Sequence, residues 1–192
     1  MPEALVRLNY QDVACTPPAA LMGHPRAASE LTESFFGYCD TILVKLYLLL
    51  MFVLETFFLE VNTTSGTDIL DLTHQVQDLV GAAGIAGGLV HLFISGSTAA
   101  LTTIEYESGV VNDLRAAIER LFPQNIPYEH DRRWGDGNGY AHVRAAFFKP
   151  CLTIPVSGGR LELGTWQQIV LLDFDNRPRR RRIQGQVMGL KP

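Results

Sequence analysis

Two imidazoles and several carboxylates lie within one short polar stretch in the C-terminal half of the chain. His130 and His142 bracket the sequence DRRWGDGNGYA, which also supplies Asp131, Asp136 and Asn138. Imidazole nitrogen and carboxylate oxygen are ligands that divalent ions accept in proteins. The spacing matches no compact ligand motif, so it predicts a metal site only if a folded loop brings these side chains together.

A second candidate for chemistry is the sequence SGSTA, which contains Gly96, Ser97 and Thr98. Glycine lets the backbone turn tightly and present successive N–H groups, and the two hydroxyl groups add donors suited to a phosphate. The same residue types also form ordinary turns between strands, and no lysine follows them as in a Walker loop. The residues alone leave both interpretations open.

Glu105 ends the run TTIE, which alternates as a strand does. In a strand, Leu101, Thr103 and Glu105 share one face, so the carboxylate would lie on a partly covered surface. It would then need a cation, a metal or a hydrogen-bond donor. An arginine such as Arg144 could be that partner, and the alternative is a carboxylate that transfers protons.

Arginine and aromatic residues near the C-terminus offer further contacts for a ligand. Arginines in the run 179–182 could hold a phosphate through paired N–H groups, although no more than about half of a strand's side chains face one site. Trp166 and Gln167 supply a flat ring and an amide. The alternative for Trp166 is a place in the core.

The elements that must position these residues become regular from Thr56 onward. Strands are expected at 57–64, 88–95, 99–107, 142–148, 151–156, 165–175 and 181–188. Helices are expected at 71–84 and 110–122, and the second ends at Pro123. The polar segment 124–142 is expected to be a long functional loop. The pattern predicts an α+β domain over 56–192, with a mixed, mostly antiparallel sheet and two main helices.

Residues 1–55 form a separate, atypical N-terminal extension that ends in an apolar segment. The run Ile42–Val61 has the length of a membrane span, but Lys45, Glu55 and Glu60 interrupt it. Its uninterrupted apolar part is Leu46–Leu54, which is shorter than the ~20 residues that a spanning helix needs. We therefore expect an apolar helix here, and we do not expect membrane contact.

Charge and cysteine content limit the class of protein further. The formal net charge is −4 for 192 residues, which argues against a general nucleic-acid binder. Six of the sixteen basic residues lie from Leu172 onward, against two aspartates, and they could form a local anion site there. Three scattered cysteines suit a reducing cytoplasm, with each thiol expected to be a small buried hydrophobe.

Five segments, taken in order, resemble the YjbQ-like family, also called the secondary thiamine-phosphate synthase family. They are DLTHQVQDLV, SGSTAALTTIEYESGVVNDL, YEHDRRWGDGNGYAHVRAA, GRLELGTWQQIVLLDFDNRPRRRRI and QVMG. The resemblance covers about Phe57 to Gly189. It implies an α+β homotrimer with a site between subunits. It also implies a weak activity that joins a hydroxymethylpyrimidine diphosphate to a thiazole phosphate and releases pyrophosphate.

The resemblance also marks individual positions. They are Gly96, Ser97, Thr98, Glu105, Asp113, His130, His142, Gly164, Trp166 and Gln167. Many relatives have a histidine where this chain has Gly96, so a three-histidine metal site would lack one ligand here. Either an oxygen atom completes the ligands of the ion, or no metal is needed.

These considerations lead to one set of expected roles. His130, Glu105 and Arg144 are the candidate catalytic residues. A divalent ion, Mg or Zn, would bind His130 and His142. A phosphorylated substrate would contact the remaining positions, which are Gly96, Ser97, Thr98, Trp166 and Gln167. The alternative function is a trimeric protein that binds a metal or a phosphorylated metabolite without turnover.

Overall fold

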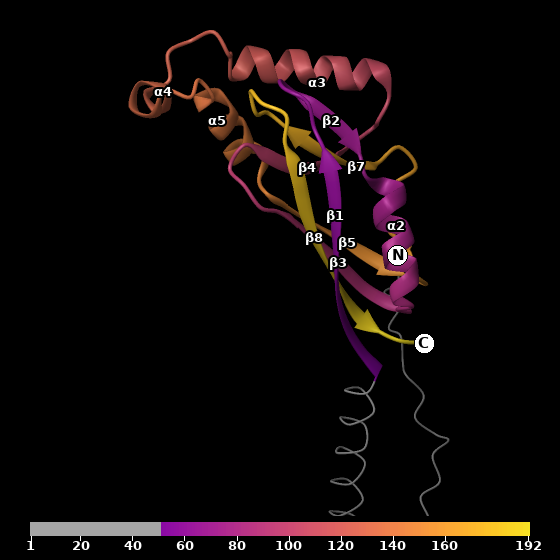
Figure 1. The fold of residues 1–192 in the computed structure, drawn as a ribbon. Helices are drawn as coiled ribbons and strands as arrows, with labels where there is room; N and C mark the ends of the chain where they lie inside the picture. The colour runs from indigo at the N-terminus through magenta and orange to yellow at the C-terminus, as the bar shows by residue number, and fades with distance from the viewer. Residues whose placement is uncertain (1–50) are drawn as a thin grey trace, which may run out of the picture. The chain divides into compact units, whose positions relative to one another are not determined.

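The computed structural model describes residues 51–192, which form two antiparallel sheets. The larger sheet has the order β1-β8-β3-β5-β6 and contains β1 (Phe52–Asn62), β8 (Arg180–Leu190), β3 (Gly87–Ile94), β5 (Cys151–Ser157) and β6 (Arg160–Leu161). The smaller sheet has the order β2-β7-β4 and contains β2 (Asp68–Asp71), β7 (Gln168–Asp173) and β4 (Ala99–Ile104). Figure 1 shows the strands with their helices. The expected α+β fold with a mostly antiparallel sheet is confirmed.

The central strand β7 is apolar on both of its faces. Ile169 and Leu171 belong to a core that also contains the inner face of the larger sheet and α2 (Thr73–Ala83). Val170 and Leu172 point the other way, into a second core beneath α3 (Ser108–Leu121) and α5 (Gly139–Phe148). A strand that is buried on both faces has a continuous run of apolar residues in its sequence, rather than alternating apolar and polar residues. The smaller sheet therefore lies between the larger sheet and the helices α3 and α5.

The segment 139–148 is helix α5, although its second half was expected to be a strand. Its buried residues are Gly139, Tyr140, Ala141, Arg144 and Ala145, which recur at helical spacing. The short helix α4 (Glu129–Trp134) also lies inside the segment expected to be a loop. The described residues thus contain four helices rather than two, and the additional two carry the histidines.

The other expected helices are confirmed close to their expected bounds. Helix α2 ends at Gly84, whose left-handed backbone suits glycine. Helix α3 begins after Glu107, whose carboxylate accepts hydrogen bonds from the N–H groups of Gly109 and Val110. These bonds lower the pKa of Glu107 below its ordinary value, although desolvation opposes the shift.

The apolar run 42–61 is a strand in the part that the structure describes. Strand β1 starts at Phe52, and residues 42–50 of the expected helix lie outside the described residues. Among residues 51–192, no helix is both long and apolar enough to cross a bilayer.

Cys151 is exposed on β5, so the expectation of a buried thiol was wrong there.

Candidate functional site

The helix pair α4 and α5 brings the two histidines together. The ring centroids of His130 and His142 lie 4.3 Å apart, with 33° between the ring planes. Gly139 begins α5 so close to α4 that an added Cβ would lie 2.5 Å from Cβ of Tyr128. Its N–H group donates to Oδ1 of Asp131 at 2.8 Å, which holds that carboxylate beside His130.

A nitrogen and two carboxylates form a compact group of potential ligands around His130. Nδ1 of His130 lies 3.2 Å from Oδ1 of Asp136 and 3.6 Å from Oδ1 of Asp131. Within residues 51–192, these three side chains are the group whose ligand atoms lie within 4.8 Å of one another. The Asn138 amide, oriented by its hydrogen-bonding surroundings, donates to both Asp136 oxygens at 3.2 and 3.3 Å.

The spacing of these atoms suits a small divalent ion. Ligand atoms about 2.1 Å from a tetrahedral zinc lie roughly 3.4 Å from one another, between the two measured distances. Nδ1 of His130 is also buried and makes no hydrogen bond of acceptable geometry within the described part of the chain. The donor set therefore fits the expected metal, with oxygen from Asp131 and Asp136 beside His130. His142 lies against this group but is not a member of it.

A cavity of about 220 Å³ lies between His142 and the serine turn. Gly96 and Ser97 line it from the segment between β3 and β4, and His142, Ala145 and Ala146 line it from α5. Two segments that are almost fifty residues apart in the sequence thus meet at one cavity. His142 belongs both to this lining and to the histidine pair.

A buried network of charges lies behind the same turn. Arg181 on β8 donates from Nε and Nη2 to the carboxylate of Asp173 at the end of β7, at 2.6 Å each. Its Nη2 also donates to Oγ1 of Thr98 at 2.8 Å. Asp175 accepts from Thr98 and from Nε of Arg179, both at 2.9 Å. The two arginines and two aspartates balance in charge.

These bonds change the expected role of Thr98. Its side chain is buried, and its oxygen is engaged by Arg181 and Asp175, so it supports the turn and does not offer a free donor to a ligand. Burial alone would raise the pKa of Asp175. Hydrogen bonds from Arg179 and Thr98, and the charges of Arg179 and Arg181, outweigh burial and lower this pKa below its ordinary value.

Arg144 is a structural residue in this fold, which corrects its expected catalytic role. Its side chain is 1% exposed and pairs with Glu119 at 2.6 Å. The same guanidinium donates to the Phe122 carbonyl and to Oγ1 of Thr67. It also lies 4.8 Å from the ring centroid of Tyr140. A ligand in solvent cannot reach these nitrogens, and the pair that was considered with Glu105 is not formed.

The remaining expected residues lie at the opposite end of β4. Glu105 follows the last residue of that strand and is exposed, so the expectation of a partly covered carboxylate was wrong. Trp166 is 71% exposed and is not a core residue. Gln167 donates to Oγ1 of Thr103 at 3.0 Å. The six residues of β4 separate this end from the turn, a length of about 20 Å at roughly 3.3–3.4 Å per residue.

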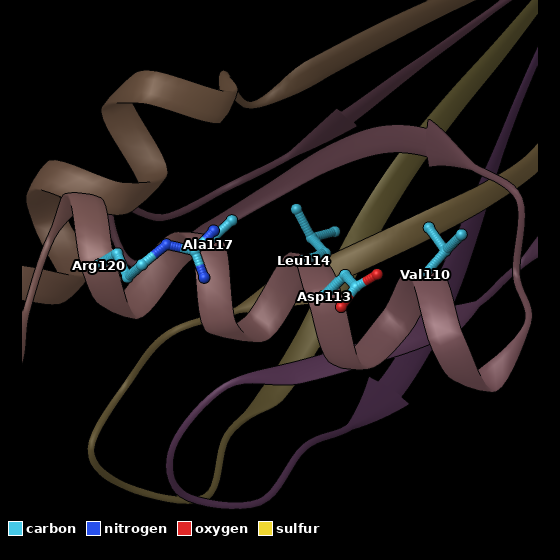
Figure 2. A pocket seen from close by; sticks show the side chains of 5 residues that line it. All are labelled: Val110, Asp113, Leu114, Ala117 and Arg120. Carbon is cyan, nitrogen blue, oxygen red and sulfur yellow. The ribbon is translucent and has the colours of Figure 1, made fainter.

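A larger cavity of about 500 Å³ lies along one face of α3 (Figure 2). Val110, Asp113, Leu114, Ala117 and Arg120 line it. Asp113, which the resemblance marks, therefore lies apart from the histidines. The lining offers one carboxylate and one guanidinium but no imidazole or hydroxyl group, so the smaller cavity is the better candidate site.

The sequence did not identify which arginine reaches the candidate site. The sequence marked the whole run 179–182 as a possible source of cations. In the structure, Arg181 is the buried arginine of that run, and it lies beside the turn. A signal was present in the alternation of β8, where Arg181, Ile183 and Val187 share the inward face. The small residues Ala145 and Ala146 were also missed, because the segment was expected to be a strand.

Comparison with known sequences gives a consistent result. The family model for the UPF0047 protein YjbQ-like family matches residues 58–190. A UPF0047 protein of Archaeoglobus fulgidus is 38% identical over 125 residues, which are 65% of this chain and 94% of the relative. The UPF0047 protein Rv2556c of Mycobacterium tuberculosis is 38% identical over 128 residues, 66% of this chain and 93% of the relative.

Solved structures show the same fold. The hypothetical protein APE1520 from Aeropyrum pernix K1 superposes with a TM-score of 0.66 at 31% identity, over 70% of this chain and 98% of that one. A YbjQ-like protein of unknown function from Sulfolobus solfataricus P2 gives a TM-score of 0.65 at 29% identity, over 71% and 99% of the two chains. By sequence and by fold, the chain belongs to the YjbQ-like UPF0047 family.

Proposed function

We propose that the chain is a secondary thiamine-phosphate synthase-type transferase, which joins a hydroxymethylpyrimidine diphosphate to a thiazole phosphate and releases pyrophosphate. The observation that carries the proposal is that His142 contacts the ring of His130 and lines the same cavity as Gly96 and Ser97. Imidazole, carboxylate and hydroxyl groups therefore gather at one place. A reaction that expels a charged oxygen leaving group needs such a set.

The proposed reaction breaks one bond and forms one bond. The C–O bond between the pyrimidine methylene carbon and the diphosphate breaks, and its electron pair leaves with the pyrophosphate. The thiazole nitrogen donates a lone pair to that carbon and forms the new C–N bond. Negative charge grows on the departing oxygen, where oriented donors stabilise it most. In this proposal Ser97, which lines the cavity, would donate a hydrogen bond to that oxygen. His130, when it does not hold an ion, would transfer a proton to the same oxygen.

The ligand group around His130 suits a divalent ion, Mg or Zn, as the cofactor. His130, Asp131 and Asp136 would hold the ion, and when bound it would neutralise charge on phosphoryl oxygens. We expect the metal content of the purified full-length protein to fall in the double variant His130→Ala, His142→Ala. Equal metal content in the two proteins, measured by elemental analysis, would exclude the histidines as ligands.

We further propose that the active unit is a homotrimer with the site completed between subunits. Glu105, Trp166 and Gln167 lie at the end of β4 opposite the Gly96–Thr98 turn and do not line the cavity that contains His142. A neighbouring subunit could present them. The predicted role of these three residues depends on this arrangement.

The outer face of the larger sheet offers a surface for such association. Phe58, Gln184 and Phe93 form one row across β1, β8 and β3, and Phe52 pairs with Leu190 in another row. The four apolar members of these rows are between 41% and 51% exposed. Exposed apolar side chains that gather on one face of a sheet are typical of association surfaces. Light scattering on the full-length protein tests the trimer, and a monomeric mass at working concentration contradicts it.

The activity test supplies the full-length protein with both substrates and measures pyrophosphate. We expect release only when both are present, and a large loss of rate in the His130→Ala variant. The assay is run on metal-free protein and on protein loaded with Mg or Zn. If neither preparation releases pyrophosphate, the transferase proposal is wrong.

One observation favours the second candidate, a trimeric protein that binds a metal or a phosphorylated metabolite without turnover. The cavity of about 220 Å³ is smaller than the roughly 300–1,000 Å³ of typical small-molecule sites. Within one chain it accommodates a phosphoryl group more readily than two ring systems. Saturable binding of one substrate by calorimetry, without pyrophosphate release when both are present, supports this alternative.

A further inference from the structure

We propose that Arg181 is the cation that binds a phosphoryl group in the cavity beside Gly96, Ser97 and His142. This inference deepens the proposed function and rests on it only for the identity of the substrate. Sequence reasoning assigned that cation to Arg144 or to any arginine of the run 179–182. The structure distinguishes one member of the run by its contacts.

The guanidinium of Arg181 is buried and partly engaged. Its side chain is 9% exposed, and Nε and Nη2 donate to Asp173 and Thr98. Nη1 donates to no acceptor among residues 51–192. An arginine that is fixed on one edge by a carboxylate keeps the N–H groups of its remaining nitrogen for another acceptor. Arg181 is therefore held in place with one free donor group.

Gly96 is the residue that lies next to this free nitrogen. It has φ of +127°, and a Cβ added to it would lie 3.3 Å from Nη1 of Arg181. A side chain at this position would be strained and would crowd the guanidinium. Glycine therefore permits the turn and adds no side chain beside Nη1. Gly96 lines the cavity and Arg181 does not, so Gly96 is the residue through which Nη1 adjoins the cavity.

The cavity supplies the other contacts that an oxyanion requires. The exposed Ser97 and the ring of His142 belong to its lining, and Ala145, Ala146 and Pro150 make the rest of the wall small and apolar. No carboxylate is part of this lining, so no fixed negative charge within it opposes an anion. Hydrogen bonds to charged groups contribute about 1.5–3 kcal/mol each, which corresponds to roughly tenfold to a hundredfold in affinity.

The test measures binding of inorganic phosphate to the full-length protein by calorimetry, without either organic substrate. Three helix variants separate charge from bulk. Ala146→Glu places a negative charge at the cavity, and Ala146→Gln adds nearly the same volume without charge. Ala116→Glu makes the same charge change on an exposed alanine of α3, outside the cavity. Both positions are exposed, so the three variants should fold.

We expect saturable phosphate binding by the natural sequence, reduced about tenfold or more by Ala146→Glu. Ala146→Gln should change the affinity much less, and Ala116→Glu should leave it nearly unchanged. Equal weakening by the two glutamate variants, or no phosphate binding by the natural sequence, would overturn the proposal. An adventitious surface site would produce the first of these results.

A second variant examines Arg181 directly. Arg181→Lys keeps a cation for Asp173 but cannot also present a second planar N–H group at Gly96. We expect it to bind phosphate about tenfold more weakly while its thermal unfolding remains cooperative. Unchanged affinity in this variant contradicts the role of Nη1. If Arg181→Lys does not fold, the comparison of Ala146→Glu with Ala116→Glu still tests whether phosphate binds in this cavity, and an absence of binding there overturns the proposal.

The outcome is separable from that of the proposed function. If phosphate binding depends on Arg181 but the two substrates release no pyrophosphate, the transferase proposal is wrong and the phosphate-site proposal stands. If pyrophosphate is released and neither Ala146→Glu nor Arg181→Lys affects the release, the phosphate-site proposal is wrong and the transferase proposal stands.

Discussion

The two ends of strand β4 differ in how much of a site each one contains. At the first end, the Gly96–Thr98 turn meets Arg181 from β8 and the cavity wall of α5. At the second end, the side chains of Glu105 and Trp166 are exposed. Residues 51–192 of a single chain therefore bring several polar groups together at the first end. The second end acquires a role only if another molecule covers it.

This difference separates residues that are needed for folding from residues that are needed for assembly. Changes at the first end should reduce the stability of the chain, because they leave buried charges unpaired. Changes at the second end should leave the stability nearly unaffected and act on association or activity. Four measurements test this contrast, beginning with the largest expected effect.

Removing Asp173 should produce the largest loss of stability. Asp173→Ala leaves the buried guanidinium of Arg181 without its carboxylate, and breaking a buried pair in this way costs about 3–5 kcal/mol. Denaturation in urea measures the change. Asp113→Ala, at an exposed aspartate on α3, is the matched control and should cost less than about 0.5 kcal/mol. A loss in Asp173→Ala as small as that of the control would show that the Asp173 network does not stabilise the fold.

The substitution Arg144→Met should lower the free energy of unfolding by about 1.5–3 kcal/mol, which is less than for Asp173→Ala. The effect is smaller because the partner Glu119 is half exposed and its carboxylate can be hydrated. The loss comes from the Phe122 carbonyl and the Thr67 hydroxyl, which lose a donor. Phosphate affinity of the folded variant should remain that of the natural sequence. A large fall in affinity with unchanged stability would instead restore the catalytic role that sequence reasoning gave to Arg144.

Asp175 should make stability depend on pH in the acidic range. Its pKa is lower in the folded chain than in the unfolded chain. Its contribution is therefore complete above the unfolded value of about 4, and it is lost as the pH falls through the folded value. Asp175→Asn should cost about 1 kcal/mol at pH 6. The difference from the natural sequence should shrink at pH 3, and a constant difference in urea denaturation at the two pH values would contradict this account.

Trp166→Ala should have the smallest effect on the stability of the isolated chain, within about 0.5 kcal/mol, since its side chain is mostly exposed. If a neighbouring subunit covers this end, the variant should shift the mass measured by light scattering or reduce turnover. If both the mass and the turnover of the variant are normal, Trp166 has no role in the proposed site.

Much of the fold follows from local patterns in the sequence. Helices α2 and α3 have apolar residues at helical spacing and recognisable stops, such as Pro123. The prediction of a strand at 142–148 was wrong, because Val143, Phe147 and Phe148 are residue types that favour strands and the segment is helix α5. The spacing of Ala141 and Ala145, both buried on one helix face, was the better signal.

The candidate site could be predicted in part. Gly96, Ser97, His130 and His142 were chosen for their chemistry, and the fold brings them to adjoining places. The roles of Thr98, Glu105 and Arg144 depended on which other side chain would lie beside each of them. Partners distant in sequence, such as Glu119 for Arg144, are fixed by tertiary packing and leave no local pattern.

The apolar character of β7 on both faces has a consequence for how its pairing is chosen during folding. A shift by one residue would exchange Ile169 and Leu171 with Val170 and Leu172, and apolar contacts would still be made on each side. The same shift would turn Asp173 away from Arg181 and leave a charge buried without a counterion. We infer that this ion pair, rather than hydrophobic alternation, selects the correct alignment of the central strand.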